Sequence, residues 1–572
     1  MSLLTRREPA TLSATRFDVL VVGGGITGAW VALDCALRGQ SVALIEKHDF
    51  GAATSSRSSK ILHGGVRYLQ QLDFARVRES ARERALVIRA APHLINHVPF
   101  LIPTYRTLQR SKMFLFAGMM GYQLLAAGTQ RILSDKATRA PAGYGLSVAQ
   151  LREIVDLPDD QITGGWVLHE CQMESSERMT QAVIARARQA GALLTNYTAL
   201  ERFSYSGGRV TGATVLDVEK GSQLEIEAKV TVNATGPWCD DLIEQFDGRP
   251  LNTGYARGAH IVTRSLIPDF AMALPSKFQA DGTVGRGSRH IFIIPWRDRS
   301  LIGTSYQETA SPCEPVHVLR DEISQLLDTV NAALPWAALG AEDVLHAFAG
   351  FYPLQSRKLD GRLYQGTGEY QLIDHARTDG VAGVITALGA KYTTARQLAE
   401  QTADLVEHKL AAGTVVGRRP TRTVKLDGGD IADIKHFEQE KIRQHDGLFR
   451  AETTRHLIKR YGTRIDDLAA ICRNAPALAT PITPERMTVG AELLYAADQE
   501  MAIHLSDAVL RRTDLGTLGD PGPEALNTCA QILGEQLGWS AAQQRLEVDL
   551  LSNEIADSDT QVVSDQQWNL DT

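Results

Sequence analysis

The chain has 572 residues, of which 44% are hydrophobic and 22% are charged, a balance typical of a globular protein with two or three domains. The formal net charge is -7, with 60 basic and 67 acidic side chains, so no overall basic field is available to bind nucleic acid. Six cysteines are scattered without a C-x-x-C pair, which predicts reduced thiols in a cytoplasmic setting, no disulfide and no metal site.

The amino-terminal segment has no apolar stretch of signal-peptide length, so nothing in it predicts export.

Residues 18–22, DVLVV, form a β-branched apolar run of buried-strand length. The sequence GGGITG follows, then a helical pattern that Gly39 ends, then a second strand in SVALIE. A strand, turn, helix and strand in this order are the context in which G-x-G-x-x-G predicts a dinucleotide site.

Each glycine of this motif has its own mechanical task. Gly23 permits the tight turn, Gly25 lets backbone N–H groups approach a pyrophosphate, and Gly28 allows the helix to pack closely on the strand. Glu46 ends the second strand, where its carboxylate can accept hydrogen bonds from ribose hydroxyls. Four serines follow in the next loop, and we expect them to bond the pyrophosphate rather than only water: Ser55, Ser56, Ser58 and Ser59.

The stretch SSKILHGGVRYLQ, residues 58–70, gathers polar groups beside two glycines. One interpretation is a turn in which Gly64 and Gly65 supply unusual dihedral angles and Arg67 faces water. The other is a backbone segment that a bound partner approaches closely, flanked by His63, Arg67 and Tyr68. The residues alone leave both interpretations open.

The most apolar stretch, residues 113–128, is too short to span a bilayer. Arg110, Lys112 and Arg131 flank it, so the segment 108–131 could lie in a membrane interface with its cations toward lipid headgroups. A buried core helix is the alternative.

Two later strands are predicted to return to the dinucleotide-binding domain. One ends at Ala234 and Gly236, and the other starts at Gly383 and ends at Gly389 before an amphipathic helix. Between them, residues 240–350 contain short β-rich runs suited to an antiparallel sheet. After about residue 425 the apolar spacing becomes helical, and the last seventeen residues are a loose polar tail.

The sequence resembles the FAD-dependent glycerol-3-phosphate dehydrogenases, within the D-amino-acid-oxidase-like flavoproteins. The resemblance covers roughly residues 17 to 520 and keeps the order of the family's motifs. The matching stretches are DVLVVGGGITGAWVALDCALRGQSVALIEKHDFGAATSSRSSKILHGGVRYL, VNATGPW, ARGAHIV, FIIPWRDRSLIGTS, LGAKYTTARQLAE and LRRTDLG.

The resemblance implies an α/β plus α fold. It has a discontinuous Rossmann-like FAD-binding domain, an antiparallel β-sheet substrate domain and a C-terminal helical domain. The expected ranges are 17–95, 165–240 and 381–415 for the FAD-binding domain, 96–164 and 241–380 for the substrate domain, 425–555 for the helical domain, and 556–572 for the tail.

The resemblance also implies a reaction in which a carbinol carbon gives hydride to non-covalently held FAD while a base takes the hydroxyl proton. His63 is favoured as the base and His260 as the group that orients the substrate, because imidazole titrates near neutral pH. Arg67 is expected to hold an anionic substrate with its planar fork of donors. Catalytic candidates are therefore His63, Arg67, His260 and Lys391. Gly64, Gly65, Ala234, Gly236, Gly389, Lys391, Tyr392 and Thr393 are expected to contact the flavin.

The expected substrate contacts are Tyr68, Thr304, Tyr352 and Arg357, and here the chain departs from the family pattern. The family usually has arginine where this chain has Tyr352 in GFYPL, another cation where it has Gly368, and an acid where it has Tyr306. A tyrosine offers one neutral hydroxyl in place of a permanent charge and five donors. Arg357 lies just beyond and is a candidate to compensate.

The leading functional hypothesis is a dehydrogenase of glycerol-3-phosphate or a related small hydroxylated metabolite that passes electrons to quinone. One alternative is an oxidase of a less anionic alcohol or amine that uses oxygen. Another is a flavin-binding protein without turnover. We expect a cytoplasmic protein that is able to dock peripherally on the inner membrane and binds no nucleic acid. A homodimer is one candidate for its oligomeric state, which the sequence leaves open.

Overall fold

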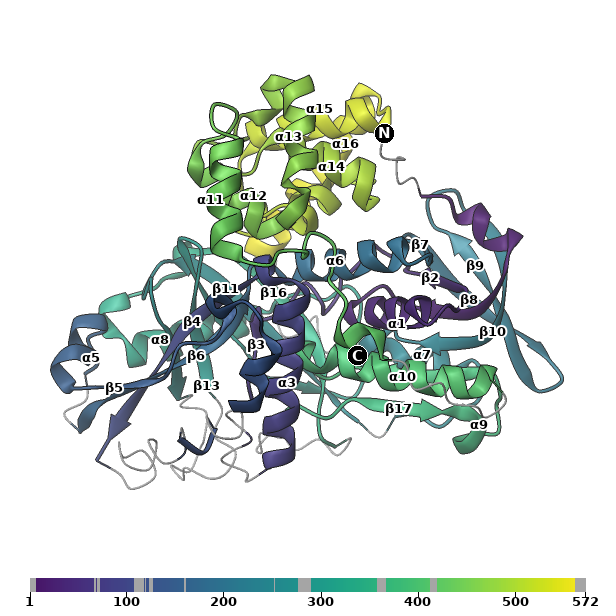
Figure 1. Ribbon diagram of the computed structural model, residues 1–572, viewed down its shortest axis with the longest axis horizontal. Helices are drawn as coiled ribbons and strands as arrows, with labels where there is room; N and C mark the ends of the chain where they lie inside the picture. Colours follow the sequence, from purple (N-terminus) through teal and green to yellow (C-terminus); the bar gives the residue numbers. More distant parts are fainter. Residues whose placement is uncertain are drawn as a thin grey trace.

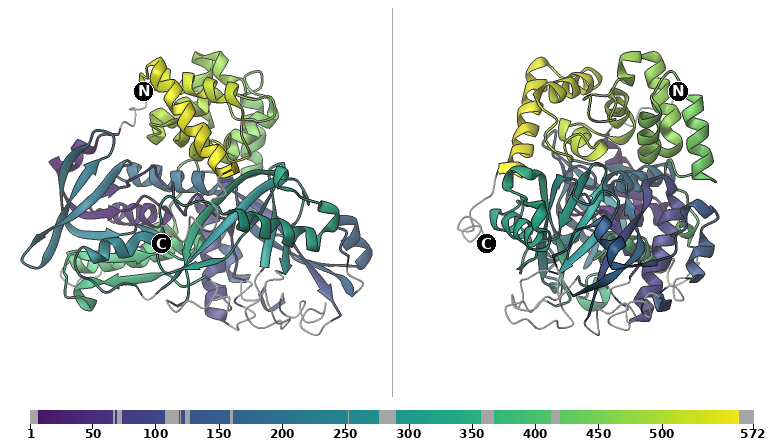
Figure 2. Two further views of the ribbon diagram at one scale, coloured as in Figure 1. Left: turned by 180° about the vertical axis from the view of Figure 1, so that it is seen from behind. Right: turned by 90° about the vertical axis from the view of Figure 1, so that its left-hand side faces the viewer.

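The computed structural model of the protein contains two β-sheets and a group of helices (Figure 1). It describes residues 7–65, 68, 73–106, 118, 120–122, 127–158, 161–251, 253–275, 290–356, 367–411 and 419–560. The sheets lie side by side, and the C-terminal helices, coloured green to yellow, stand over both of them (Figures 1 and 2).

Sheet A contains eight strands among the described residues and has a parallel centre. Strand β1 (Arg16–Val22) lies at the middle because its apolar, β-branched residues are buried on both faces. In spatial order the other strands are β17 (Gln371–Asp374), β18 (Val384–Leu388), β10 (Ser222–Asn233), then β1, β2 (Val42–Ile45) and β7 (Leu193–Thr195). Strands β8 (Thr198–Ser206) and β9 (Arg209–Asp217) extend β10 as an antiparallel hairpin.

Helices cover one face of sheet A. The first helix, α1 (Ile26–Leu37), packs against both α6 (Ser176–Gln189) and α10 (Ala395–Leu410), and Trp30 near its start is buried in the shared core. Ser175 caps α6 by accepting a hydrogen bond from the backbone N–H of Arg178. The carboxyl ends of β1, β10 and β18 therefore meet at one edge, beside the start of α1.

Sheet B contains ten strands among the described residues, and all its pairings are antiparallel except that of β12 with β4. In spatial order they are β15 (Gln307–Thr309), β11 (Tyr255–Arg264), β14 (Arg299–Gly303), β13 (His290–Trp296), β12 (Ala271–Pro275), β4 (Ile95–Tyr105), β6 (Ile162–Met173) and β3 (Ile61–Leu62), with β16 (Val344–Pro353) on β11 and β5 (Tyr144–Leu146) on β6.

The two faces of sheet B have different partners. Ile261, Ile293 and Ile302 point to one face, where they pack against α8 (Arg320–Ala333). Val262 and Trp296 belong to the opposite face, which turns toward the segments that follow β2. In the described part of the chain, the sheets are also flanked by α3 (Phe74–Ala90), α5 (Val148–Ile154), α7 (Cys239–Glu244) and α9 (His375–Thr378).

The C-terminal helices form two small apolar cores of their own. Their bounds are α11 (Ile434–Gln444), α12 (Ala451–Tyr461), α13 (Ile465–Asn474), α14 (Gly490–Glu500), the π-helix η13 (Asp507–Arg512), α15 (Pro523–Leu537) and α16 (Ala541–Thr560). The predicted fold class, α/β plus a helical domain, is confirmed.

Three strands join a different sheet from the one that the sequence ranges suggest. Strand β3 lies within 17–95 and most of β6 lies within 165–240, both expected in the FAD-binding domain, but the two strands pair with each other in sheet B. Strand β17 pairs with β18 in sheet A although it lies within 241–380. The hydrophobic pattern of a strand does not specify its partner, so sheet membership could not be read from these segments alone. The domain boundaries as a whole stay a prediction.

All six cysteines are free thiols, and five of them are buried. Within the described ranges, no helix has the length and apolar character needed to cross a bilayer. Most of the apolar segment 108–131, including Arg110 and Lys112, lies outside the described residues, while Arg131 is exposed.

Candidate active site

The glycine turn occupies the carboxyl edge of sheet A, between β1 and α1. Gly23 has a φ of 106°, and a Cβ atom there would lie 2.8 Å from the carbonyl carbon of Ala234. A Cβ atom at Gly28 would overlap the carbonyl oxygen of Gly23, so only glycine allows α1 to pack this closely on the turn. At Gly25 the nearest atom to an added Cβ is the Ser55 hydroxyl, at 3.1 Å. The backbone here forms a shallow cradle of the shape that a pyrophosphate needs.

Glu46 ends β2 next to this turn. Its Oε2 accepts a hydrogen bond from the backbone N–H of Gly24 at 2.6 Å, and its Oε1 accepts one from the backbone N–H of His48 at 2.9 Å. Burial raises the pKa of the Glu46 carboxyl. Each oxygen keeps a second lone pair for a hydroxyl donor, so the carboxylate fits the ribose of a dinucleotide.

The four predicted serines behave differently from one another. Ser55 Oγ accepts a hydrogen bond of 2.9 Å from the backbone N–H of Ile26, the first residue of α1. Ser56 Oγ donates to backbone carbonyls of its own loop, and Ser58 Oγ accepts from the backbone N–H of Lys60. Ser59 lies half-buried in the same loop. Ser55 is thus the serine that reaches the N-terminus of α1, where an anion binds best.

The two later strand ends reach the same edge. The backbone N–H of Ala234 donates to Val22 at 2.9 Å, and Gly236 turns with a φ of 65°. After β18, Gly389 lies so close to the Thr27 hydroxyl of α1 that an added Cβ atom would meet it at 2.5 Å. The predicted return of both strands to the dinucleotide turn is therefore confirmed.

Residues 391–393 join this edge to its surroundings. The Lys391 ammonium lies 4.5 Å from the centroid of the Tyr68 ring, within cation–π distance. The Tyr392 hydroxyl bonds the backbone carbonyl of Ser176 at 2.8 Å and lies 2.9 Å from the Thr180 hydroxyl, and Thr393 is buried. The structure thus brings Tyr68 and Lys391 together, although 323 positions separate them in the sequence.

The His63 segment directly follows β3 of sheet B and leads toward α3. His63 is exposed, with its ring 6.1 Å from that of Phe292 on β13. The backbone N–H of Gly64 donates to Glu170 Oε2 at 2.8 Å, and Gly65, with a φ of 85°, packs on Ser80 of α3. Arg67, predicted to hold an anionic substrate, lies outside the described residues.

A network of buried polar side chains holds the His63 segment in place, and the sequence motifs did not predict it. Arg84 Nη1 donates to Glu170 Oε2 at 3.0 Å, and its Nη2 donates to the Tyr122 hydroxyl at 3.0 Å. A Cβ atom at Gly64 would overlap both Arg84 and Tyr122. The available signal was an arginine on the apolar stripe of α3, four residues before Ile88.

One face of sheet B carries a row of four residues across four strands. Strand pairing places Phe292, Gly303, His260 and Phe348 next to one another in that order. The His260 and Phe348 rings stack with their centroids 5.2 Å apart. A side chain at Gly303 would overlap the His260 ring, so glycine at this position leaves room for the imidazole.

His260 is only 6% exposed, and neither ring nitrogen has a hydrogen-bond partner in the described part of the chain. Burial, together with the nearby charge of Lys60, lowers the pKa of His260 to about 3. The imidazole is therefore neutral at physiological pH and offers one donor and one acceptor. Buried polar groups normally have hydrogen-bond partners, so His260 is a candidate to bind a ligand.

Lys60 is a second group that the sequence analysis missed. It has a φ of 58°, is 1% exposed, and forms an ion pair of 2.7 Å with Glu177 at the start of α6. Its ammonium also lies 5.1 Å from the Trp296 ring and 5.8 Å from the Phe348 ring. Lys60 thus connects the loop of sheet A to the residues around His260.

Tyr352 and Thr304 come together beside Gly258, two residues before His260 on β11. A Cβ atom at Gly258 would lie 3.1 Å from the Tyr352 ring and would overlap the Thr304 hydroxyl. The absence of a side chain at Gly258 therefore leaves room for the Thr304 hydroxyl and the Tyr352 ring. Arg357, the candidate to compensate for the missing arginine, lies outside the described residues.

The other two departures from the family pattern have local explanations. The backbone N–H of Gly368 donates to Pro353 at 2.7 Å, and a Cβ atom at Gly368 would overlap the carbonyl oxygen of Leu354, so the close packing of two backbone segments requires glycine. The Tyr306 hydroxyl donates to Glu308 Oε1 on β15. Both positions lie near the end of β16 or the start of β15, on the Tyr352 side of sheet B.

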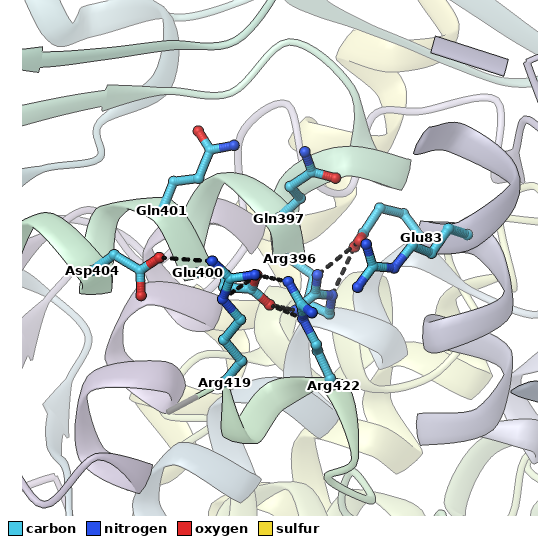
Figure 3. Close-up of a pocket in the computed structure, with 9 residues that line it drawn as sticks. Glu83, Arg396, Gln397, Glu400, Gln401, Asp404, Arg419 and Arg422 are labelled. Carbon is cyan, nitrogen blue, oxygen red and sulfur yellow. Dashed lines mark hydrogen bonds and ion pairs between the residues drawn. The ribbon is translucent and has the colours of Figure 1, made fainter. Parts of the chain in front are cut away.

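A separate charged cavity of about 240 Å³ lies between α3, α10 and residues 419–422 (Figure 3). Arg396 bonds both Glu83 and Glu400 there, and Arg422 bonds Glu400. The cavity is lined by Arg82, Glu83, Arg396, Gln397, Glu400, Gln401, Asp404, Arg419 and Arg422. None of these is a predicted site residue, and these ion pairs join α3 to α10 and the following segment.

Comparisons with known proteins agree with this geometry. Residues 18–405 match the family described as FAD dependent oxidoreductase, and residues 419–544 match the C-terminal domain of alpha-glycerophosphate oxidase. The chain is 32% identical over 544 residues to a glycerol-3-phosphate dehydrogenase of Synechocystis, covering 92% of this chain and 94% of the relative. It is 30% identical to an aerobic glycerol-3-phosphate dehydrogenase of Staphylococcus epidermidis, with 95% and 96% covered.

A solved structure is similar over nearly the whole length. The glycerol-3-phosphate dehydrogenase from Bacillus halodurans, determined in complex with FAD, superposes with a TM-score of 0.76 at 25% identity and covers 97% of each chain.

Proposed function

Because this chain belongs to the family of FAD-dependent glycerol-3-phosphate dehydrogenases, we propose that it oxidises the secondary alcohol of glycerol-3-phosphate or of a related small hydroxylated metabolite. The protein is an FAD-dependent oxidoreductase, and its glycine turn and Glu46 fit the ADP half of that cofactor. FAD, when bound, supplies the acceptor for the two electrons that leave the substrate carbon as hydride.

The single observation that carries this proposal is the buried imidazole of His260 among Phe292, Gly303 and Phe348, which has no hydrogen-bond partner within the described ranges. A neutral imidazole held by stacking can donate a hydrogen bond to a substrate hydroxyl or accept one from it, and so fix the orientation of the carbinol. A pKa of about 3 makes His260 a weak base at neutral pH, which supports an orienting role.

His63 is our candidate for the base that removes the hydroxyl proton. It lies on the Phe292 side of the row, and its exposed ring can pass a proton to water. The buried Arg84–Glu170 pair holds the neighbouring Gly64 in place and so restricts the position of His63. Arg67 and Arg357 remain candidates for binding the phosphate.

An anaerobic substrate panel tests this function. The holoenzyme is mixed without oxygen with glycerol-3-phosphate, glycerol and neutral or amine-bearing analogues, and bleaching of the flavin absorbance is followed. We expect at least one small hydroxylated compound to bleach it. If dithionite reduces the flavin but no compound on the panel does, the proposed reaction is wrong.

A second candidate follows from Tyr352, which places a neutral phenol beside Thr304 at the position where the family pattern predicts an arginine. An oxidase or dehydrogenase of a less anionic alcohol or amine would suit such a pocket. Under this alternative, the neutral members of the panel bleach the flavin faster than glycerol-3-phosphate does.

We propose quinone as the electron acceptor, since the relatives that cover most of the chain are named dehydrogenases. Quinone is held in membranes, which supports peripheral docking on the inner membrane face through the segment 108–131. Faster oxygen consumption than quinone reduction by the reduced enzyme would contradict the first point. Equal flotation of wild type and an Arg110, Lys112 and Arg131 triple alanine variant with anionic liposomes would contradict the second.

A further inference from the structure

A buried aspartate in the loop after β2 receives two arginines from the helical domain. Arg512 binds both carboxylate oxygens of Asp49, with Nη1 to Oδ2 at 2.6 Å and Nη2 to Oδ1 at 2.7 Å. Arg511 Nε donates to Oδ2 at 2.6 Å, and Asn196 Nδ2 donates to Oδ1 at 3.2 Å. Asp49 is 1% exposed, so solvent does not replace these contacts.

Both arginines are also bonded to residues of the helical domain to which they belong. Arg511 Nη2 donates to Asp507 Oδ1 at 2.6 Å, and Arg512 Nη2 donates to the backbone carbonyl of Glu500 at 2.9 Å. Asp507 also accepts a hydrogen bond of 2.6 Å from the Tyr197 hydroxyl. The helical domain therefore presents a fixed pair of cations to the loop.

The residues next to Asp49 continue directly to the dinucleotide turn. The backbone N–H of Gly51 donates to the carbonyl oxygen of Gly24 at 3.1 Å, and an added Cβ atom at Gly24 would lie 2.7 Å from the Phe50 ring. On the other side of Gly24, its backbone N–H donates to Glu46. Residues 46–51 thus bond both the N–H and the carbonyl oxygen of Gly24, and Asp49 fixes this segment to the two arginines of the helical domain.

The contact of Asp49 with the two arginines depends on their opposite charges. Burial alone would raise the pKa of Asp49, but the charges of Arg512 and Arg511 outweigh burial and lower it to about 2. Removing one partner of a buried ion pair leaves an uncompensated charge, so the loop would have to move toward water.

We propose that Arg511 and Arg512 are positioning residues for the cofactor: by fixing Asp49 they hold the dinucleotide turn in the form that binds FAD. Binding of FAD and docking of the helical domain are then coupled, and by reciprocity FAD also tightens the docking. This coupling does not depend on which substrate the enzyme oxidises.

The test compares two Arg→Lys variants at the same domain interface. Arg512→Lys keeps the charge but loses the two-pronged contact with Asp49. Arg188→Lys is the control, because Arg188 Nη1 donates to the backbone carbonyl of Gln499 at 3.0 Å across the same interface, between α6 and α14. This substitution leaves the Glu500 carboxylate, which also lies near Arg512, paired with Arg178. Each full-length variant is stripped of FAD, and its dissociation constant for FAD is measured by flavin fluorescence, together with the Tm of the apo and holo forms.

We expect Arg512→Lys to weaken FAD binding by about tenfold or more and to shrink the rise in Tm on adding FAD, since a lost charged hydrogen bond is typically worth that much. Arg188→Lys should lower the Tm of both forms and leave FAD affinity nearly unchanged. Equal FAD affinity in the two variants would overturn the proposal.

A second measurement covers the case in which Arg512→Lys does not fold. Hydrogen exchange of the wild type is then measured across residues 500–514 with and without FAD. The coupling predicts slower exchange there when FAD is bound. Identical exchange in the apo and holo forms would overturn the proposal without any variant.

Discussion

The edge of sheet A and the face of sheet B meet at the candidate site but are built in different ways. At the edge, the cradle consists of backbone, and the glycines at 23 and 28 have no room for a side chain. On the face, side chains from four strands supply the chemistry, and His260 keeps both nitrogens unpartnered among the described residues. A backbone cradle tolerates few changes, whereas a side-chain surface can change its charge through one substitution.

The largest effect should come from breaking the cradle. Gly28→Ala puts a Cβ atom onto the carbonyl oxygen of Gly23, so α1 must move away from the turn. We expect the purified protein to lose its FAD and about 1–3 kcal/mol of stability. Gly25→Ala is the control for folding, because its Cβ atom meets the movable Ser55 hydroxyl at 3.1 Å. FAD absorbance and thermal unfolding measure both, and a yellow, fully loaded Gly28→Ala protein would contradict this view of the edge.

On the face of sheet B, His260→Gln should leave FAD bound but lower kcat by about a hundredfold, the size of effect expected when an active site loses a fixed polar group. The acid limb of the pH profile of kcat/KM should persist in this variant and disappear in His63→Gln, because His260 is already neutral above about pH 3. Steady-state rates across pH separate the two roles. Loss of the acid limb in His260→Gln would reverse them.

A moderate effect is expected at Tyr352. Tyr352→Arg should improve the affinity for glycerol-3-phosphate, because a charged hydrogen bond typically contributes roughly 1.5–3 kcal/mol, or about one to two powers of ten. Tyr352→Phe, which changes no charge, is the control. The KM for glycerol-3-phosphate and for glycerol measures the preference. If Tyr352→Arg instead impairs an efficient wild type, another cation such as Arg357 already binds the phosphate.

The smallest effect concerns how the helical domain rests on each sheet. His504 contacts Glu219 of the sheet A hairpin and Glu547 of α16. Burial would lower the pKa of His504, but the hydrogen bond to Glu547 and the charge of Asp507 outweigh it and raise the pKa to about 9. On the sheet B side, Arg297 pairs with Glu174 and with Asp514 of the helical domain. Burial lowers the pKa of Arg297, but only to about 10, so Arg297 keeps its charge at neutral pH.

Because the pKa of His504 is higher in the folded protein than its ordinary value of about 6.5, binding of the proton stabilises the fold. This contribution is fully present below about pH 6.5 and is lost as the pH rises toward 9. We therefore expect the Tm of the wild type to fall by a few degrees between pH 7 and pH 9, and the Tm of His504→Gln to change less over that range. Parallel Tm curves for the two proteins would show that His504 does not make the docking pH-dependent.

Local motifs made the edge of sheet A predictable. The glycine turn, Glu46 and the two returning strand ends all lie next to strands that can be recognised from their own residues. The face of sheet B was less accessible, because its row depends on the register of four strands and its charged partners come from distant segments. The pairs Lys60 with Glu177 and Arg84 with Glu170 are 117 and 86 positions apart, and no local pattern announces such pairs.

The contact between Asp49 and Arg512 also has a consequence for biosynthesis. The two residues are 463 positions apart, so the ribosome completes the glycine turn long before it makes the arginine that neutralises Asp49. Domains of nascent chains generally fold in order from the N-terminus. If the arginines position the turn as we propose, the nascent chain carries a loose flavin site, and lasting uptake of the cofactor begins only after nearly the whole chain has been translated.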